Sequence, residues 1–158
     1  MSRYIFLLII LALILIFYFL PRGDDAGEIE AVFDEIVEAA GKKDYEGIME
    51  HFSVQYKDEY GAGYPVVKNI IIKVFEKYDS VEASYSGLSV VINKNEYGEK
   101  EAAANTDVEV TGYKSGIPDK LIGDNESSDN ITVTLRKSGL GGWKIIRVEG
   151  LDNPEDYY

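Results

Sequence analysis

The residues best suited to chemistry are two neighbouring carboxylates set among tyrosines. Asp58 and Glu59 lie between Tyr56 and the pair Tyr60 and Tyr64 in the stretch QYKDEYGAGY. A carboxylate in an apolar pocket beside tyrosine hydroxyls can act as a general base, which makes Asp58 a candidate catalytic residue. The competing interpretation is that the tyrosines cover the rim of the core while both acids stay in water.

The second candidate base is His51, the single histidine of the chain. It falls within a short predicted helix, so an exposed or core-edge histidine without a chemical role is the alternative. The chain has no cysteine, which excludes disulfides, thiolate metal sites and cysteine nucleophiles. The sequence also has no phosphate-binding glycine loop, nucleophile elbow or metal-ligating histidine pair.

A group of acidic residues late in the chain is the one candidate metal site. Asp124, Glu126 and Asp129 could gather around a calcium ion, because hard cations bind clustered oxygen ligands. Their spacing does not match an EF-hand loop, so a solvated acidic loop is the preferred interpretation. We therefore expect no metal and no cofactor.

Aromatic side chains are the other signal of a binding site. Tyrosine brings contact area and a polar group at low entropic cost, although some of these rings are expected only to pack the fold. The candidates for lining a ligand pocket are Tyr56, Tyr60, Tyr64, Tyr85 and Trp143.

The chain is strongly acidic after its first 22 residues. Residues 23–158 hold all 28 acidic side chains but 14 of the 16 lysines and arginines, a net charge of −14. Such a surface repels nucleic acid and anionic headgroups, so no nucleic-acid partner is expected. Solubility is the simplest role for this charge. The segment is long enough for one domain and too short for two.

The first 22 residues have the composition of a membrane anchor. Residues 5–20 are sixteen consecutive apolar or aromatic residues. A helix over residues 4–20 would be roughly 25 Å long, near the lower limit for a hydrocarbon core of about 30 Å. A cleaved signal peptide, giving a secreted protein, is the alternative, but the small residues of a cleavage site are absent. Arg3 before the run and the acids from Asp24 onward predict a cytoplasmic N-terminus and an extracytoplasmic domain.

Three helices are predicted next. Apolar side chains recur at helical spacing over residues 28–40, 45–52 and 65–78. Asp44 is expected to cap the short second helix, and Pro65 occupies the first position of the third.

Alternation with a period of two predicts about four antiparallel strands after these helices. A bulge is expected at Gly87, and the polar stretch from Gly112 to Asn130 is interpreted as a long exposed loop. The expected strands are residues 81–92, 102–111, 131–136 and 143–148.

This order of elements resembles the nuclear transport factor 2-like (NTF2-like) superfamily, the cystatin-like α+β cone. The resemblance rests on the opening EIEAVFDEIVEAAGKKDYEGIMEHFS and on NITVTLRKSGLGGWKIIRVEG, in which Trp143 begins the last strand. It covers residues 28–151. It implies an α+β domain with three helices packed on a curved antiparallel sheet, and any functional pocket between the two layers. The superfamily includes isomerases and dehydratases as well as non-catalytic binding and assembly modules.

The predicted organisation is therefore a membrane anchor, a short linker, an NTF2-like domain and an acidic tail. Their expected ranges are 1–22, 23–27, 28–151 and 152–158. We expect the domain to bind a small apolar ligand or a protein partner without catalysis, with a homodimer through the sheet face as a further expectation. The alternatives are an isomerase- or dehydratase-type enzyme using a carboxylate in the pocket, and an assembly module of an envelope complex.

Overall fold

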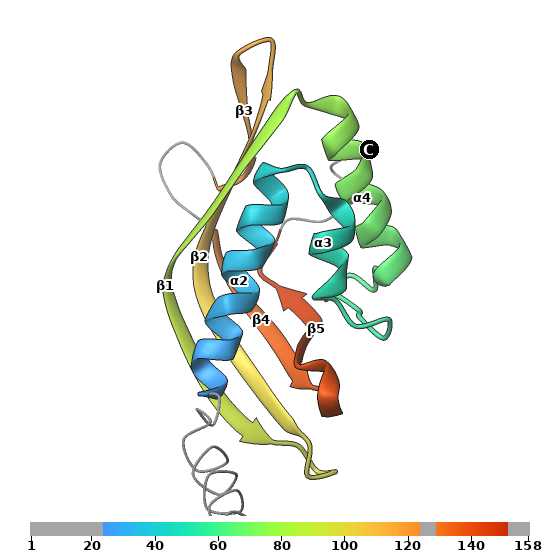
Figure 1. The fold of residues 1–158 in the computed structure, drawn as a ribbon, viewed down its shortest axis with the longest axis vertical. Coiled ribbons are helices and arrows are strands. Elements are labelled where there is room, and N and C mark those ends of the chain that lie inside the picture. The colour runs from blue at the N-terminus through green and yellow to red at the C-terminus, as the bar shows by residue number, and fades with distance from the viewer. Residues whose placement is uncertain (1–23, 124–128, 152–158) are drawn as a thin grey trace, which may run out of the picture.

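A computed structural model describes residues 24–123 and 129–151, and within them three helices precede an antiparallel sheet (Figure 1). The α+β class expected from the sequence is confirmed. No helix in these two ranges is long and apolar enough to span a bilayer. The predicted anchor, the acidic tail and the acids Asp124 and Glu126 lie outside the described residues.

The first two helices are joined by a tight corner. Helix α2 spans Asp25–Gly41 and α3 spans Tyr45–Glu50. Asp44 caps α3 as predicted, because its carboxylate accepts a hydrogen bond of 3.0 Å from the backbone N–H of Gly47. The left-handed residue that turns the chain is Lys43, with φ 56°, and not the glycine that ends α2.

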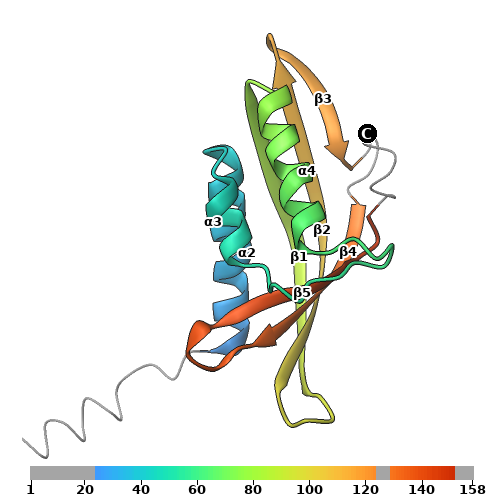
Figure 2. The same ribbon diagram turned by 90° about the vertical axis from the view of Figure 1, so that its right-hand side faces the viewer.

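Helix α4 spans Tyr64–Lys77 and begins with a proline in its first turn, as expected. Figure 2 shows it beside the strands β1 and β2, away from α2. Phe75 is its only buried residue. The apolar stripe of this helix is therefore only partly covered by the rest of the domain.

The sheet has five strands, whereas about four were expected. In chain order these are β1 (Ser80–Lys94), β2 (Lys100–Lys114), β3 (Ile117–Ile122), β4 (Asp129–Lys137) and β5 (Trp143–Glu149). They are arranged β1-β2-β4-β5, and β3 pairs with the end of β2 that β4 leaves free. The short turn Gly139–Gly141 joins β4 to β5. The predicted bulge is confirmed, since the pairing of β1 with β2 shifts between Ser86 and Ser89.

The long exposed loop expected over residues 112–130 is wrong in its first half. Strand β2 runs on to Lys114, and β3 returns along it after a two-residue turn. Ser115 and Gly116 have φ values of 53° and 77°, the pattern of a type I′ hairpin. Pro118 is tolerated there because β3 pairs with β2 alone among the described strands, and a proline without an N–H fits such an edge.

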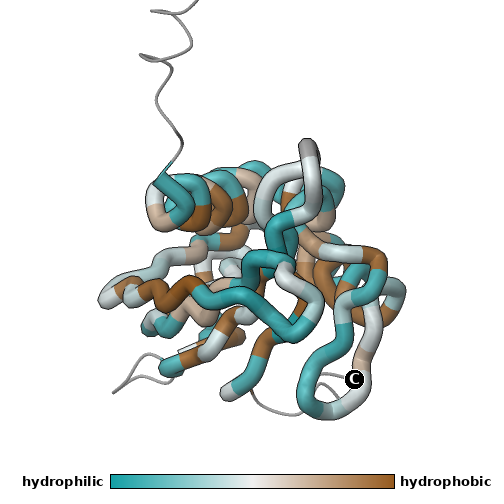
Figure 3. Tube along the Cα trace, turned by 90° about the horizontal axis from the view of Figure 1, so that it is seen from below, coloured by the Kyte–Doolittle hydropathy of each residue, from teal (hydrophilic) through white to brown (hydrophobic). Residues whose placement is uncertain are grey.

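The hydrophobic core lies between the helices and one face of the sheet, and Figure 3 shows hydrophobic segments of the helices on the side toward the strands. One cluster joins α2 to β2, β4 and β5 around Ile29, Ala104 and Leu135. A second cluster includes Ile48 and Phe75. It lies beneath α3, α4 and the C-terminal end of α2. The core therefore continues from the middle of the sheet toward α4.

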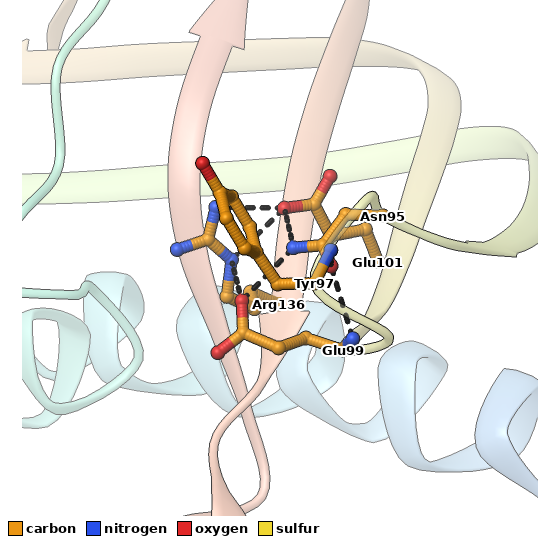
Figure 4. Close-up of polar contacts among 5 residues, drawn as sticks. All are labelled: Asn95, Tyr97, Glu99, Glu101 and Arg136. Carbon is orange, nitrogen blue, oxygen red and sulfur yellow. Dashed lines mark hydrogen bonds and ion pairs between the residues drawn. The ribbon is translucent and has the colours of Figure 1, made fainter.

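Polar contacts fasten the far end of the β1–β2 hairpin (Figure 4). The side-chain oxygen of Asn95 accepts hydrogen bonds of 3.0 Å from the backbone N–H groups of Tyr97 and Glu99. Arg136 of β4 donates from Nε and Nη2 to one oxygen of Glu101, at 2.9 and 2.7 Å. These contacts hold the hairpin against β4.

Candidate functional site

A largely apolar cavity of about 310 Å³ lies between the three helices and the sheet. Its wall includes residues of every helix, of β1, β2, β3 and β5, and of the segment after α3. Apart from Asp58 and Glu59, each lining residue is apolar or aromatic. The volume falls at the lower end of the range of about 300–1,000 Å³ that is typical of small-molecule sites.

Helix α4 forms one side of this cavity. Val67, Ile70, Ile71 and Val74 have the i, i+3, i+4, i+7 spacing of a single helix face, and all four line the cavity. Each is only partly buried, although it points toward the sheet side of the helix. The apolar face of α4 is thus available to a ligand as well as to the core.

The predicted cluster after α3 lies at the cavity as a group. This segment is fixed to β5, because the backbone N–H groups of Ser53 and Lys57 donate to the carbonyls of Ile145 and Ile146 at 2.8 and 3.1 Å. The structure therefore places Tyr56, Asp58, Glu59 and Tyr60 together in the wall.

Both carboxylates of this cluster already accept backbone hydrogen bonds. An oxygen of Asp58 accepts from the N–H of Ala62 at 2.7 Å, and an oxygen of Glu59 accepts from the N–H of Gly150 at 2.7 Å. The hydroxyl of Tyr60 donates to the carbonyl of Leu151 at 3.1 Å. The bonds of Glu59 and Tyr60 tie the segment to the residues that follow β5, whereas the bond of Asp58 closes a turn within the segment.

Tyr56 is the most deeply placed member of the cluster, with 5% of its surface exposed. Its ring packs edge-on against Phe52 with 5.1 Å between centroids. Burial raises the pKa of Tyr56 well above its usual value, and the negative charge of Asp58 raises the pKa further. The phenol therefore stays protonated at neutral pH, as a hydrogen-bond donor and acceptor and not as a base.

His51 is not among the lining residues. It lies at the C-terminal end of α3, and its Nε2 is 3.2 Å from a carboxylate oxygen of Glu35. Burial lowers the pKa of His51, and the charge of Glu35 partly opposes that effect. The two predicted acid–base candidates, His51 and Asp58, therefore do not share the cavity.

The other three aromatic candidates also lie away from the cavity wall. Tyr64 begins α4 and packs against the first core cluster. The hydroxyl of Tyr85 donates to Asp34 at 2.6 Å, which ties β1 to α2. Trp143 is buried in the core, and its indole Nε1 has no hydrogen-bond partner among the described residues.

The contribution of β3 to the cavity was not predicted from the sequence. Leu121 and Ile122 line the cavity from this strand, opposite Val110 of β2. The signal that could have found them is the Ser-Gly pair at 115–116, a common two-residue hairpin turn, followed by apolar residues.

The described residues contain no group of three or more His, Cys, Asp or Glu side chains placed to hold a metal ion. Asp129 lies at the start of β4, where its carboxylate accepts a hydrogen bond of 3.0 Å from the N–H of Gly123.

No protein-family model matches the sequence, and no curated protein matches it. Several solved structures do share its fold. An NTF2-like superfamily protein from Salmonella enterica has a TM-score of 0.61 and 15% identity, over 82% of this chain and 93% of that one. The chain has the NTF2-like, cystatin-like fold.

Two further matches show how varied the proteins with an NTF2-like fold are. A putative scytalone dehydratase from Novosphingobium aromaticivorans has a TM-score of 0.61 and 16% identity, over 77% of this chain and 78% of that one. Bd1075 from Bdellovibrio bacteriovorus has a TM-score of 0.60 and 17% identity, over 78% of this chain. The present chain covers only 40% of the length of Bd1075. At such identities the matches show a shared fold and no shared activity.

Proposed function

We propose that this chain is a membrane-anchored NTF2-like domain that faces the extracytoplasmic side and binds a small apolar ligand in its cavity without converting it. The observation that carries the proposal is the cavity between α4 and the sheet, whose wall is apolar except for two carboxylates at one side. Burying an apolar ligand there gains about 25 cal/mol per Å² of apolar surface removed from water.

Binding is favoured over catalysis by the polar groups present. A general base must reach the substrate, yet His51 lies outside the cavity wall and the protonated phenol of Tyr56 cannot take up a proton. Asp58 does line the cavity, but one of its oxygens accepts the bond from Ala62. The cavity therefore offers a surface for an apolar molecule and little machinery to transform it.

Labelling of the full-length chain in membrane vesicles tests the cavity. An alkyl alcohol with a photoreactive diazirine at its far end is expected to label residues of α4 and β3 in a saturable way. Ile71→Trp, which fills the cavity from α4, should remove most of this labelling, whereas Val91→Trp on the exposed part of β1 should not. Labelling that is equal in both variants would show that the probe binds elsewhere.

Anchoring and orientation rest on the apolar run at residues 4–20 and are tested separately. Because the chain has no cysteine, Ser2→Cys and Ser138→Cys each introduce one thiol, on opposite sides of the run. A membrane-impermeant maleimide added to intact cells is expected to label only Ser138→Cys. Recovery of the chain in the soluble fraction would contradict the anchor.

An isomerase- or dehydratase-type enzyme is the second candidate, because Asp58 lines the cavity beside Tyr56. A putative scytalone dehydratase with the same fold is consistent with this reading. The enzyme hypothesis predicts that Asp58→Asn abolishes conversion of a bound compound while the compound still binds. Identical recovery of unchanged compound from wild type and Asp58→Asn would count against it.

A further inference from the structure

The charge on the cavity wall is of one sign. Asp58 and Glu59 are its only ionisable groups besides the tyrosines, and no lysine, arginine or histidine lines it in the described part of the chain. A ligand with a carboxylate or phosphate would place its charge beside two carboxylates without a cationic partner, which is unfavourable in an apolar site. A cationic ligand would find complementary charge.

The hydroxyl of Tyr56 is a second, independent feature. Tyr56 is 95% buried, lines the cavity, and its hydroxyl has no hydrogen bond to any residue in the described ranges. The hydroxyl oxygen is not sealed off, since the one wholly buried polar side-chain atom without a hydrogen bond in the described ranges is Nε1 of Trp143. A polar group of a ligand in the cavity would provide the missing bond.

The acceptors near this position match a group that only donates. The Asp58 carboxylate has about four lone-pair sites, of which the bond from Ala62 uses one, and the phenol oxygen of Tyr56 accepts as well. A protonated amine carries three N–H donors and no acceptor. Asp58 and Tyr56 both line the cavity and lie two residues apart in the chain, so a ligand head group at that part of the wall would lie near both.

We propose that the ligand is a single-chain amphiphile with a protonated amine, whose head group binds Tyr56 and Asp58 and whose apolar chain lies along the face of α4. The proposal rests on the cavity-binding function above and adds the chemical class of the ligand. The chain would contact Ile70, Ile71 and Val74 on one side and the partly buried residues of β3 on the other. Figure 2 shows β3 next to β2, at the same end of the sheet as α4.

Three photoreactive probes with the same decyl chain, ending in an amine, an alcohol or a carboxylate, test this inference on the full-length chain in membrane vesicles. Labelling is quantified for the peptides of α4 and β3 over a range of probe concentrations. The ratio of amine to alcohol labelling is compared between variants in the same vesicles, so that partition of the probes into lipid cancels. We expect wild type to favour the amine over the alcohol by about tenfold, and the carboxylate to label least.

Conservative variants locate the head group. Tyr56→Phe and Asp58→Asn should each lower the preference for the amine to about threefold or less, while the alcohol still labels, which shows that the cavity remains formed. The matched controls are Tyr97→Phe and Glu96→Gln in the exposed turn between β1 and β2, and these should keep the full preference. An amine preference that both cavity variants leave unchanged would overturn the assignment of the head group.

The remaining outcomes separate this inference from the proposed function. Labelling by the alcohol with no preference for the amine would overturn the amine ligand and leave the apolar cavity standing. A preference for the carboxylate would overturn it in the same way. Absence of saturable labelling by all three probes would overturn both proposals.

Discussion

The ring of Tyr78 lies directly against the backbone of Gly112: a Cβ atom added at this glycine would lie 2.5 Å from the ring carbon Cγ. Tyr78 follows α4 and is 3% exposed, and its hydroxyl donates to Asp119 of β3. The ring therefore fixes the end of α4 to both β2 and β3, at the edge of the region that contains the cavity.

Gly112→Ala is expected to destabilise the domain by about 1–3 kcal/mol, because a buried ring with a hydrogen-bonded hydroxyl cannot move aside without cost. The measurement is urea unfolding of the full-length chain in detergent, followed by circular dichroism. Gly41→Ala is the matched control, since a Cβ there would have no atom within 4 Å. The control should be neutral or slightly stabilising, by up to about 1 kcal/mol, at the end of a helix. Equal effects of the two changes would contradict the close packing.

Trp143 shows why an aromatic residue in a sequence does not by itself identify a pocket. The prediction placed it among ligand-binding candidates because aromatic side chains suit binding surfaces, but it is 3% exposed in the core beside Ile145 and Leu135. The alternation of β5 was predictable, whereas the layer that a large ring fills depends on how helices pack across the sheet.

The buried indole also leads to a stability prediction. Trp143→Phe should cost less than about 1.5 kcal/mol, because the loss of contact area is offset by removal of an N–H without a partner among the described residues, whose burial costs about 1–3 kcal/mol. Trp143→Ala should cost about 3–5 kcal/mol, since it leaves a cavity. Both values come from chemical unfolding. A phenylalanine variant as unstable as the alanine variant would indicate that Nε1 is bonded in solution.

The local parts of the site could be read from the sequence, but its assembly could not. Helical spacing predicted the apolar stripe of α4, and the tyrosines and acids around Asp58 were recognised as a group. The hairpin that brings Leu121 to the cavity was missed, because Pro118 and the polar residues around it indicated a loop. Pairing of β3 with β2 is a long-range contact, and no local pattern shows that an edge strand with a proline will find its partner.

The single histidine gives a prediction for acid pH. Burial lowers the pKa of His51 below its ordinary value of 6.5, despite the nearby Glu35. Below about pH 6.5 the imidazole is therefore protonated more readily in the unfolded chain than in the folded domain. The folded domain loses stability as the pH falls below this value. Between about pH 7 and pH 5 wild type should lose more stability than His51→Gln.

Proton NMR measures the titration of His51 directly, because the chain has no other histidine whose ring signals could overlap. The midpoint is expected below 6.5 in wild type. Glu35→Gln removes the charge that favours the imidazolium, so its midpoint should be lower still. A wild-type midpoint above 6.5 would mean that the ion pair with Glu35 outweighs burial.

The hydrogen bond from Tyr85 to Asp34 gives the corresponding prediction for alkaline pH. Burial, followed by the bond to Asp34, raises the pKa of Tyr85 to about 12. Because the folded state holds this proton to higher pH than the unfolded chain, stability that is full below about pH 10 is lost as the pH rises toward 12. Tyr85→Phe should be less stable than wild type at neutral pH by about 0.5–1.5 kcal/mol, and the difference should shrink between about pH 10 and pH 11.

Tyr97→Phe is the control, because this residue is 80% exposed, and it should show neither effect. A difference between wild type and Tyr85→Phe that stays constant with pH would show that ionisation of Tyr85 is not linked to folding.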